Sequence, residues 1–221
     1  MNTPVDFFPF SLLVACPVLW IAVLVWTLTQ VSWPAMIANR RAQHIFFAAT
    51  LFVAVVATMR AGILPGLTIH MLAATSITMM MGWPLAVLSL SLAQLVIALA
   101  GFESLENLAV NGIFSAVVPV LISFLFFRLV VKPLPHNPFV FIMVGGFFNG
   151  AVTIALTACA VSYGFWVSGI YSQEVIWHNY LSYLPLMMFP EGFLNGMFIS
   201  GMVAFQPQWL SCFDEDSYFN S

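Results

Sequence analysis

The chain alternates between long apolar runs and short polar stretches, a pattern typical of a protein whose helices cross a membrane. About 20 residues span the hydrocarbon core as a helix, and most of the apolar runs approach this length. We therefore predict an all-α integral membrane protein with about seven transmembrane helices. It forms one polytopic domain of residues 1–206, followed by a short acidic tail of residues 207–221. The predicted spans are residues 10–31, 45–59, 68–81, 85–100, 113–131, 139–163 and 180–205.

Turn signals surround the third predicted span, which is the shortest. The Pro-Gly pair at residues 65–66 predicts a turn before it, and the Gly-Trp-Pro sequence at residues 82–84 predicts a break after it. This pattern places His70 one turn into a short membrane helix. An ionisable side chain at membrane depth is costly and often functional, so His70 is the first candidate for a site residue.

The lysine and arginine residues are placed asymmetrically, which predicts the orientation of the chain. With seven spans, the basic loops around residues 40–41 and 128–132 lie on the same side as the acidic tail. Basic loops favour the cytoplasmic side of a membrane. We therefore expect the N-terminus outside, the C-terminus in the cytoplasm and His70 near the outer face, with Arg60 as an exception to the rule.

Composition indicates that lipid is the main solvent of the chain. Hydrophobic residues make up 62% of the sequence and charged residues only 6%, whereas about 25% of the residues in a soluble domain are charged. The sequence has no basic cluster suited to nucleic acid, no glycine-rich phosphate loop and no HExxH pair. We expect a multi-pass protein of the cell's inner (plasma) membrane that contacts membrane lipid and binds no nucleic acid.

Two ionisable residues fall within predicted spans. His70 could hydrogen-bond a neighbouring carbonyl, or it could bind a transition metal, since imidazole is a common ligand of nickel, cobalt, copper and zinc. Glu191 has Asn195 four residues later, on the same helical face. We interpret Glu191 as part of a buried polar clamp in preference to a direct ligand.

A polar stretch precedes the fifth predicted span. Glu103 and Glu106 are interpreted as solvated residues of an outer loop. Asn111 is followed by a long apolar run, so its amide could reach either a backbone group or a bound ligand.

Residues 66–120 combine several short motifs in a fixed order. A Pro/Gly turn precedes the histidine segment, then come a Gly-x-Pro break, a long apolar helix with Gln94 near its end, and a Leu-Ala-x-Asn entry that ends at Asn111. The last span adds a Glu-Gly pair at Glu191. In these features the chain resembles the CbiM/NikM family, the substrate-capturing membrane components of energy-coupling-factor (ABC-type) importers of cobalt and nickel.

The resemblance implies a seven-span transporter component that is not an enzyme. Its transported ligand would be Co²⁺ or Ni²⁺. Because the sequence has no ATP-binding motif, it would work with separate ATPase and transmembrane coupling subunits.

The resemblance also implies a planar nitrogen site for the metal. In the family the ligands are the terminal amine, the backbone nitrogen and imidazole of a histidine at position two, and a later histidine. Here Met1 would supply the amine and His70 the later imidazole, whereas position two is Asn2, whose amide cannot replace an imidazole. The possible supporting or compensating residues are Asn111, Glu191 and His178.

Asn2 motivates an alternative function. The chain could be a family relative that has lost metal import and serves as a small-solute-binding, accessory or sensor membrane protein. A membrane enzyme using Glu191 or His70 as an acid or base is the least favoured hypothesis, because the sequence places no second catalytic group.

Overall fold

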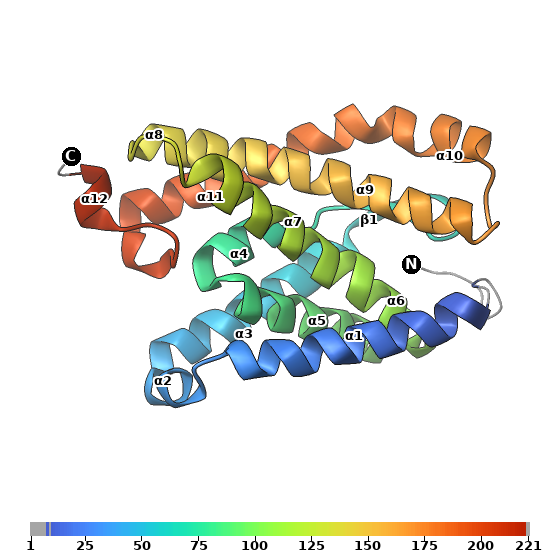
Figure 1. The fold of residues 1–221 in the computed structure, drawn as a ribbon, viewed down its shortest axis with the longest axis horizontal. Helices are drawn as coiled ribbons and strands as arrows, with labels where there is room; N and C mark the ends of the chain where they lie inside the picture. Colours follow the sequence, from blue (N-terminus) through green and yellow to red (C-terminus); the bar gives the residue numbers. More distant parts are fainter. Residues whose placement is uncertain (1–7, 9, 220–221) are drawn as a thin grey trace.

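Long apolar helices form most of the structure, as the apolar runs predict. The computed structural model describes residue 8 and residues 10–219, and Figure 1 shows its long helices running roughly along one axis. A shorter apolar helix, Trp83–Leu99, accompanies five described helices that are long and apolar enough to cross a membrane. These five are Leu12–Gln30, Arg40–Thr58, Leu105–Val131, Pro138–Val167 and Gln173–Phe205. The chain is an all-α, multi-pass membrane protein.

Several of the long helices are built from consecutive segments of different helical type. The α-helices are α1 (Phe10–Gln30), α2 (Trp33–Ala38), α3 (Arg40–Thr58), α4 (Ala74–Met81), α5 (Trp83–Leu99), α6 (Leu108–Gly112), α7 (Val118–Phe126), α8 (Pro138–Val140), α9 (Asn149–Val167), α10 (Gln173–Asn179), α11 (Leu184–Phe205) and α12 (Glu215–Phe219). The π-helical segments are η2 (Ile113–Val117), η3 (Phe127–Val131) and η4 (Phe141–Phe148). The 3₁₀ turns are η1 (Leu105–Asn107), η5 (Leu181–Tyr183) and η6 (Pro207–Trp209), and the strands are β1 (Arg60–Leu64) and β2 (Leu67–His70).

The prediction of residues 68–81 as one membrane helix is wrong. The first of these residues belong to β2, which pairs antiparallel with β1 and places His70 opposite Arg60. Gly66 turns the hairpin with a φ of 81°, a left-handed conformation that glycine adopts without strain. Ala73 also has a positive φ, 51°, just before α4 begins. The eight residues of α4 give about 12 Å of helix, which is too short to span a bilayer alone.

The short helix α4 lies in the interior of the bundle, where it contacts α5, α7, α9 and α11. Its residues 74–80 are all buried. Glycines allow α11 to pack closely against η4 and α9, because a Cβ on Gly192 would lie 2.8 Å from the Phe147 carbonyl oxygen, and one on Gly150 would lie 2.9 Å from the Asn195 amide nitrogen. Small residues commonly permit such close approach between membrane helices.

The two ends of the bundle carry different elements. Figure 1 shows α2, α8 and α12 toward one end, and α6 and α10 toward the other. At the first end Arg41 lines a pocket with Trp209, and the His136 ring contacts the Tyr218 ring with their centroids 5.0 Å apart. The two basic loops therefore meet the C-terminal segment at one end of the molecule, which is the grouping that the charge pattern predicts.

The segment after residue 206 packs against this end of the bundle. The Ser211 backbone N–H donates to the Met80 carbonyl oxygen at 3.1 Å, at the end of α4. Leu210 and Phe213 are buried in an apolar cluster that we name the tail-end cluster. Its other buried members are Met79, Val131, Phe141, Ile199 and Val203.

Candidate metal site

His70, the last residue of β2, lines a small cavity between the hairpin and the helices. The cavity has a volume of about 20 Å³, which is enough for one water molecule or one small ion. The His70 side chain is partly buried. The polar residues that line this His70 cavity with it are Thr68, Ser115, Thr157 and Tyr180.

His70 supplies the imidazole among the residues that line this cavity. A neutral imidazole has a free ring nitrogen and is the form that binds a metal ion.

An ion pair holds the hairpin against the loop before α6. The Arg60 guanidinium donates to the Glu103 carboxylate at 2.5 Å and also to the Phe102 carbonyl oxygen. The Glu103 side chain is only 9% exposed and accepts a further hydrogen bond from the Asn111 amide. The interpretation of Glu103 as a solvated loop residue is therefore wrong. Asn111 supports the partner of Arg60 and is not among the residues that line the His70 cavity.

Glu191 and Asn195, one turn apart on α11, fasten the chain between β2 and α4. The Glu191 carboxylate accepts hydrogen bonds from the backbone N–H groups of Leu72 at 2.9 Å and Ala73 at 2.8 Å. The Asn195 amide donates to that carboxylate at 2.9 Å, and its oxygen accepts from the Ser76 N–H and hydroxyl at 2.8 and 2.7 Å. We name this arrangement the α11 clamp. It positions the end of the hairpin, but neither Glu191 nor Asn195 lines the His70 cavity.

Thr157, which the sequence analysis does not single out, contributes a hydroxyl to the cavity. Its side chain is 5% exposed, and its Oγ1 has no hydrogen-bond partner within the described part of the chain. Its four-residue spacing from Thr153 is the signal in the sequence that could have pointed to it. The described residues hold no group of three or more His, Cys, Asp or Glu side chains that could bind a metal. One imidazole and several hydroxyls are thus the donors that the described residues bring to this cavity.

Comparison with known proteins places the chain in a family. The family model for CbiM, described as the cobalt uptake substrate-specific transmembrane region, matches residues 2–209. The chain belongs to the CbiM family. The chain is a multi-pass membrane protein of transition-metal transport, and its family is one of transporter components. No curated protein matches the chain.

Two solved structures share the fold of this CbiM-family chain. One is described as a truncated transition metal transporter; it has a TM-score of 0.71 and 17% identity, over 94% of this chain and 99% of the other. The second is described as a transition metal transporter; it has a TM-score of 0.69 and 16% identity, over 94% and 93% of the two chains. At these identities the likeness establishes the fold.

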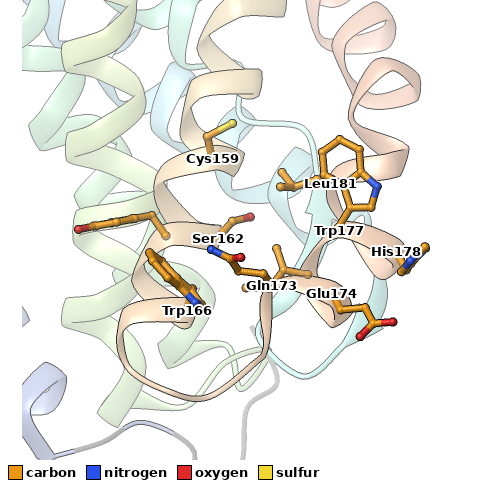
Figure 2. A pocket seen from close by; sticks show the side chains of 10 residues that line it. Cys159, Ser162, Trp166, Gln173, Glu174, Trp177, His178 and Leu181 are labelled. Carbon is orange, nitrogen blue, oxygen red and sulfur yellow. The ribbon is translucent and has the colours of Figure 1, made fainter.

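The structure does not bring His178 to the His70 cavity. His178 is exposed on α10 and lines an open groove of about 550 Å³. Figure 2 shows His178 and Glu174 on α10, with Trp166 of α9 elsewhere on the wall of the groove. Among the described residues, none lines both this groove and the His70 cavity.

Met1, the other predicted metal ligand, lies outside the described residues. Phe8, the first described residue, is buried and stacks on Phe165 of α9 with ring centroids 5.8 Å apart. Phe114 and Val161 line both the small cavity beside Phe8 and the His70 cavity. Phe8 therefore anchors the described chain beside the candidate metal site.

Proposed function

We propose that this chain is the substrate-capturing membrane component for uptake of cobalt or nickel, with His70 as its principal side-chain ligand. The observation that carries the proposal is an imidazole at the wall of a cavity with room for one small ion. Imidazole suits nickel and neighbouring first-row metals. The α11 clamp and the Arg60–Glu103 pair fix the strands of the hairpin that carries His70, and such support keeps a ligand in place before the ion arrives.

The size of the cavity favours an ion over an organic solute. Pockets for small organic molecules usually have volumes of about 300–1,000 Å³, far larger than the 20 Å³ beside His70. The groove beside His178 falls within that range at about 550 Å³. This groove is the observation that favours the alternative, a CbiM relative that binds a small solute, and it is separate from His70.

We propose the terminal amine of Met1 as the second nitrogen donor. Phe8 lies beside the His70 cavity, and each extended residue spans about 3.3–3.6 Å. The chain before Phe8 therefore has the length to return to His70. Asn2 supplies no imidazole, so the cavity hydroxyls or water would complete the coordination of the ion.

We also propose seven membrane crossings, with the N-terminus outside and the C-terminus in the cytoplasm. The hairpin and α4 together would make the third crossing and α5 the fourth. The bundle end that carries the basic loops and α12 would face the cytoplasm, in keeping with the preference of basic loops for that side. Separate ATPase and coupling subunits would supply the energy for uptake.

Metal accumulation by cells that carry the chain with its ATPase and coupling subunits tests the proposal. We expect His70→Ala to reduce nickel or cobalt accumulation at least about ten-fold, because it removes the principal side-chain ligand. His44→Ala is the matched control, since His44 is exposed on α3 and does not line the cavity. Native accumulation by His70→Ala would contradict the proposal. Loss of metal accumulation in His178→Ala together with native accumulation in His70→Ala would assign the metal ligand to His178 instead.

A further inference from the structure

Three polar residues follow one face of α9 through the interior of the protein. Asn149, Thr153 and Thr157 are spaced four residues apart and have exposed fractions of 0%, 1% and 5%. At a rise of 1.5 Å per residue they extend over about 12 Å. The rest of the buried surface of α9 is mostly apolar. Polar residues buried between membrane helices either hydrogen-bond neighbouring helices or serve a function such as substrate passage.

Hydrogen bonds extend this face to α4 and α7. The Thr75 hydroxyl donates to Thr153 at 3.3 Å, and the Thr153 hydroxyl donates to the Asn149 amide oxygen at 3.2 Å. The Asn149 amide nitrogen donates to the Ser123 carbonyl oxygen at 3.3 Å. We name these five residues the polar column. All three distances lie at or beyond the long end of the usual range, so the column is loosely bonded.

The two ends of the column carry hydroxyls without partners in the described chain. They are the Oγ1 of Thr157 and the Oγ of Ser123, and both side chains are more than nine-tenths buried. A buried polar group normally finds a hydrogen-bond partner, so each such hydroxyl calls for an explanation. Thr157 lines the His70 cavity, which gives its hydroxyl direct access to whatever occupies that space.

The column connects the cavity with the tail-end cluster. One turn before Asn149, Gly145 packs against Met79 and Val131, since a Cβ on Gly145 would lie 3.3 Å from the Met79 methyl carbon and 3.5 Å from Val131. Met79 and Val131 belong to the tail-end cluster. The polar side chains therefore extend from the His70 cavity to the tail-end cluster. This cluster lies toward the bundle end that carries α12.

We propose that the polar column is the path by which a divalent transition-metal cation leaves His70 toward the cytoplasmic end of the protein. The inference rests on the proposed function of the chain in metal uptake. Hydroxyl and amide oxygens are harder ligands than imidazole and suit nickel and cobalt less well. The ion, or the water it carries, would therefore bind the column more weakly than it binds His70. Passage requires sites that are favourable enough to enter and weak enough to leave.

Two substitutions test the path. Neither removes a hydrogen bond within the described chain, because the hydroxyl that each deletes has no partner there. Thr157→Val and Ser123→Ala each delete an unpartnered hydroxyl, at opposite ends of the column. In the assembled transporter we expect each to lower nickel and cobalt accumulation about ten-fold. Thr157→Ser restores the hydroxyl and should retain at least half of the native accumulation. The matched control is Thr27→Val, because Thr27 is also fully buried with an unpartnered hydroxyl but lies on α1.

Equilibrium binding of Ni²⁺ to the purified chain distinguishes residues of the exit path from residues that bind the metal at its site. We expect Ser123→Ala to bind within about two-fold of the native chain, whereas His70→Ala loses binding. Native accumulation by both Thr157→Val and Ser123→Ala would overturn the path and leave the proposed function standing. An equal loss in Thr27→Val, or loss of binding by Ser123→Ala, would also overturn it. Failure of the native chain to bind or accumulate either metal would overturn the proposed function itself.

Discussion

The α11 clamp and the polar column are both buried polar regions beside α4, but they differ in how completely their hydrogen bonds are formed. In the clamp, both Glu191 carboxylate oxygens and both polar atoms of the Asn195 amide have partners, at distances of 2.7–2.9 Å. In the column, the bonds are 3.2–3.3 Å long, and the hydroxyls of Thr157 and Ser123 have no described partner.

This difference supports a structural role for the clamp and the proposed transport role for the column. Satisfied buried networks rigidify a protein, because every alternative arrangement leaves a polar group unpaired. The clamp therefore fixes the chain between β2 and α4. The column keeps oxygen atoms that a passing ion or its water could use. Substitutions in the clamp should thus affect stability first, and substitutions in the column should affect transport first.

The largest effect is expected at the centre of the clamp. Glu191→Ala leaves the Leu72 and Ala73 N–H groups buried without an acceptor, which should lower the free energy of unfolding by about 3 kcal/mol or more. Thermal unfolding of the purified protein in detergent measures this loss. Glu191→Gln keeps one acceptor oxygen and should lose about half as much. An unfolding temperature of Glu191→Ala equal to that of the native chain would remove the structural role of the clamp.

The next effect concerns the close contact that holds Asn195 in place. A Cβ on Gly150 would lie 2.9–3.2 Å from three Asn195 side-chain atoms, so Gly150→Ala should destabilise the protein by about 1–3 kcal/mol through overpacking. Gly201→Ala is a matched control within α11, because its Cβ would meet nothing within 4 Å. We expect the control to be neutral or to stabilise by up to about 1 kcal/mol. Equal unfolding temperatures for the two alanine variants would count against the packing described here.

A smaller effect is expected for the ion pair that holds the other side of the hairpin. A double-mutant cycle with Arg60→Gln and Glu103→Gln should give a coupling energy of about 1–2 kcal/mol. The value is modest because both side chains keep some contact with solvent, at 16% and 9% exposure. Thermal unfolding of the four proteins gives the coupling energy. Strict additivity would show that the two side chains do not act as a pair.

Removing a hydroxyl from the column should not destabilise the protein, in contrast to removing the Glu191 carboxylate from the clamp. Thr157→Val removes a buried hydroxyl that makes no hydrogen bond in the described chain, so the free energy of unfolding should stay the same or rise by up to about 1 kcal/mol. The unfolding temperature of the metal-free protein checks this. Destabilisation as large as that of Glu191→Ala would mean that Thr157 belongs to a structural network, and the contrast between the two regions would disappear.

The sequence predicts the long helices well because their apolar runs have a length that only a membrane helix explains. It does not predict the hairpin, because Leu67–His70 is a short strand inside a run of apolar residues. Periodicity cannot separate a strand from a helix over so few positions. The Gly82 break is visible, but the brevity of α4 depends on the positive φ of Ala73, and alanine gives no signal for that conformation.

The sequence predicts contacts within the site only between residues that are close together along the chain. The Glu191–Asn195 contact follows from a four-residue spacing on one helix. The Arg60–Glu103 pair joins residues 43 positions apart, so the sequence left both charges without partners. His178 and His70 were both expected near the outer face, yet they line different cavities, because a shared depth in the membrane does not fix the position around the bundle.

Equilibrium binding of Ni²⁺ and Co²⁺ to the purified chain tests the central claim most directly. If His70 is the principal side-chain ligand of an ion-sized cavity, the native protein should bind one ion per chain, and His70→Ala should bind at least about ten-fold more weakly. The matched variant His44→Ala should bind like the native protein. Absence of binding by the native chain, or equal affinities for the native chain and His70→Ala, would contradict the assignment of His70 as the metal ligand.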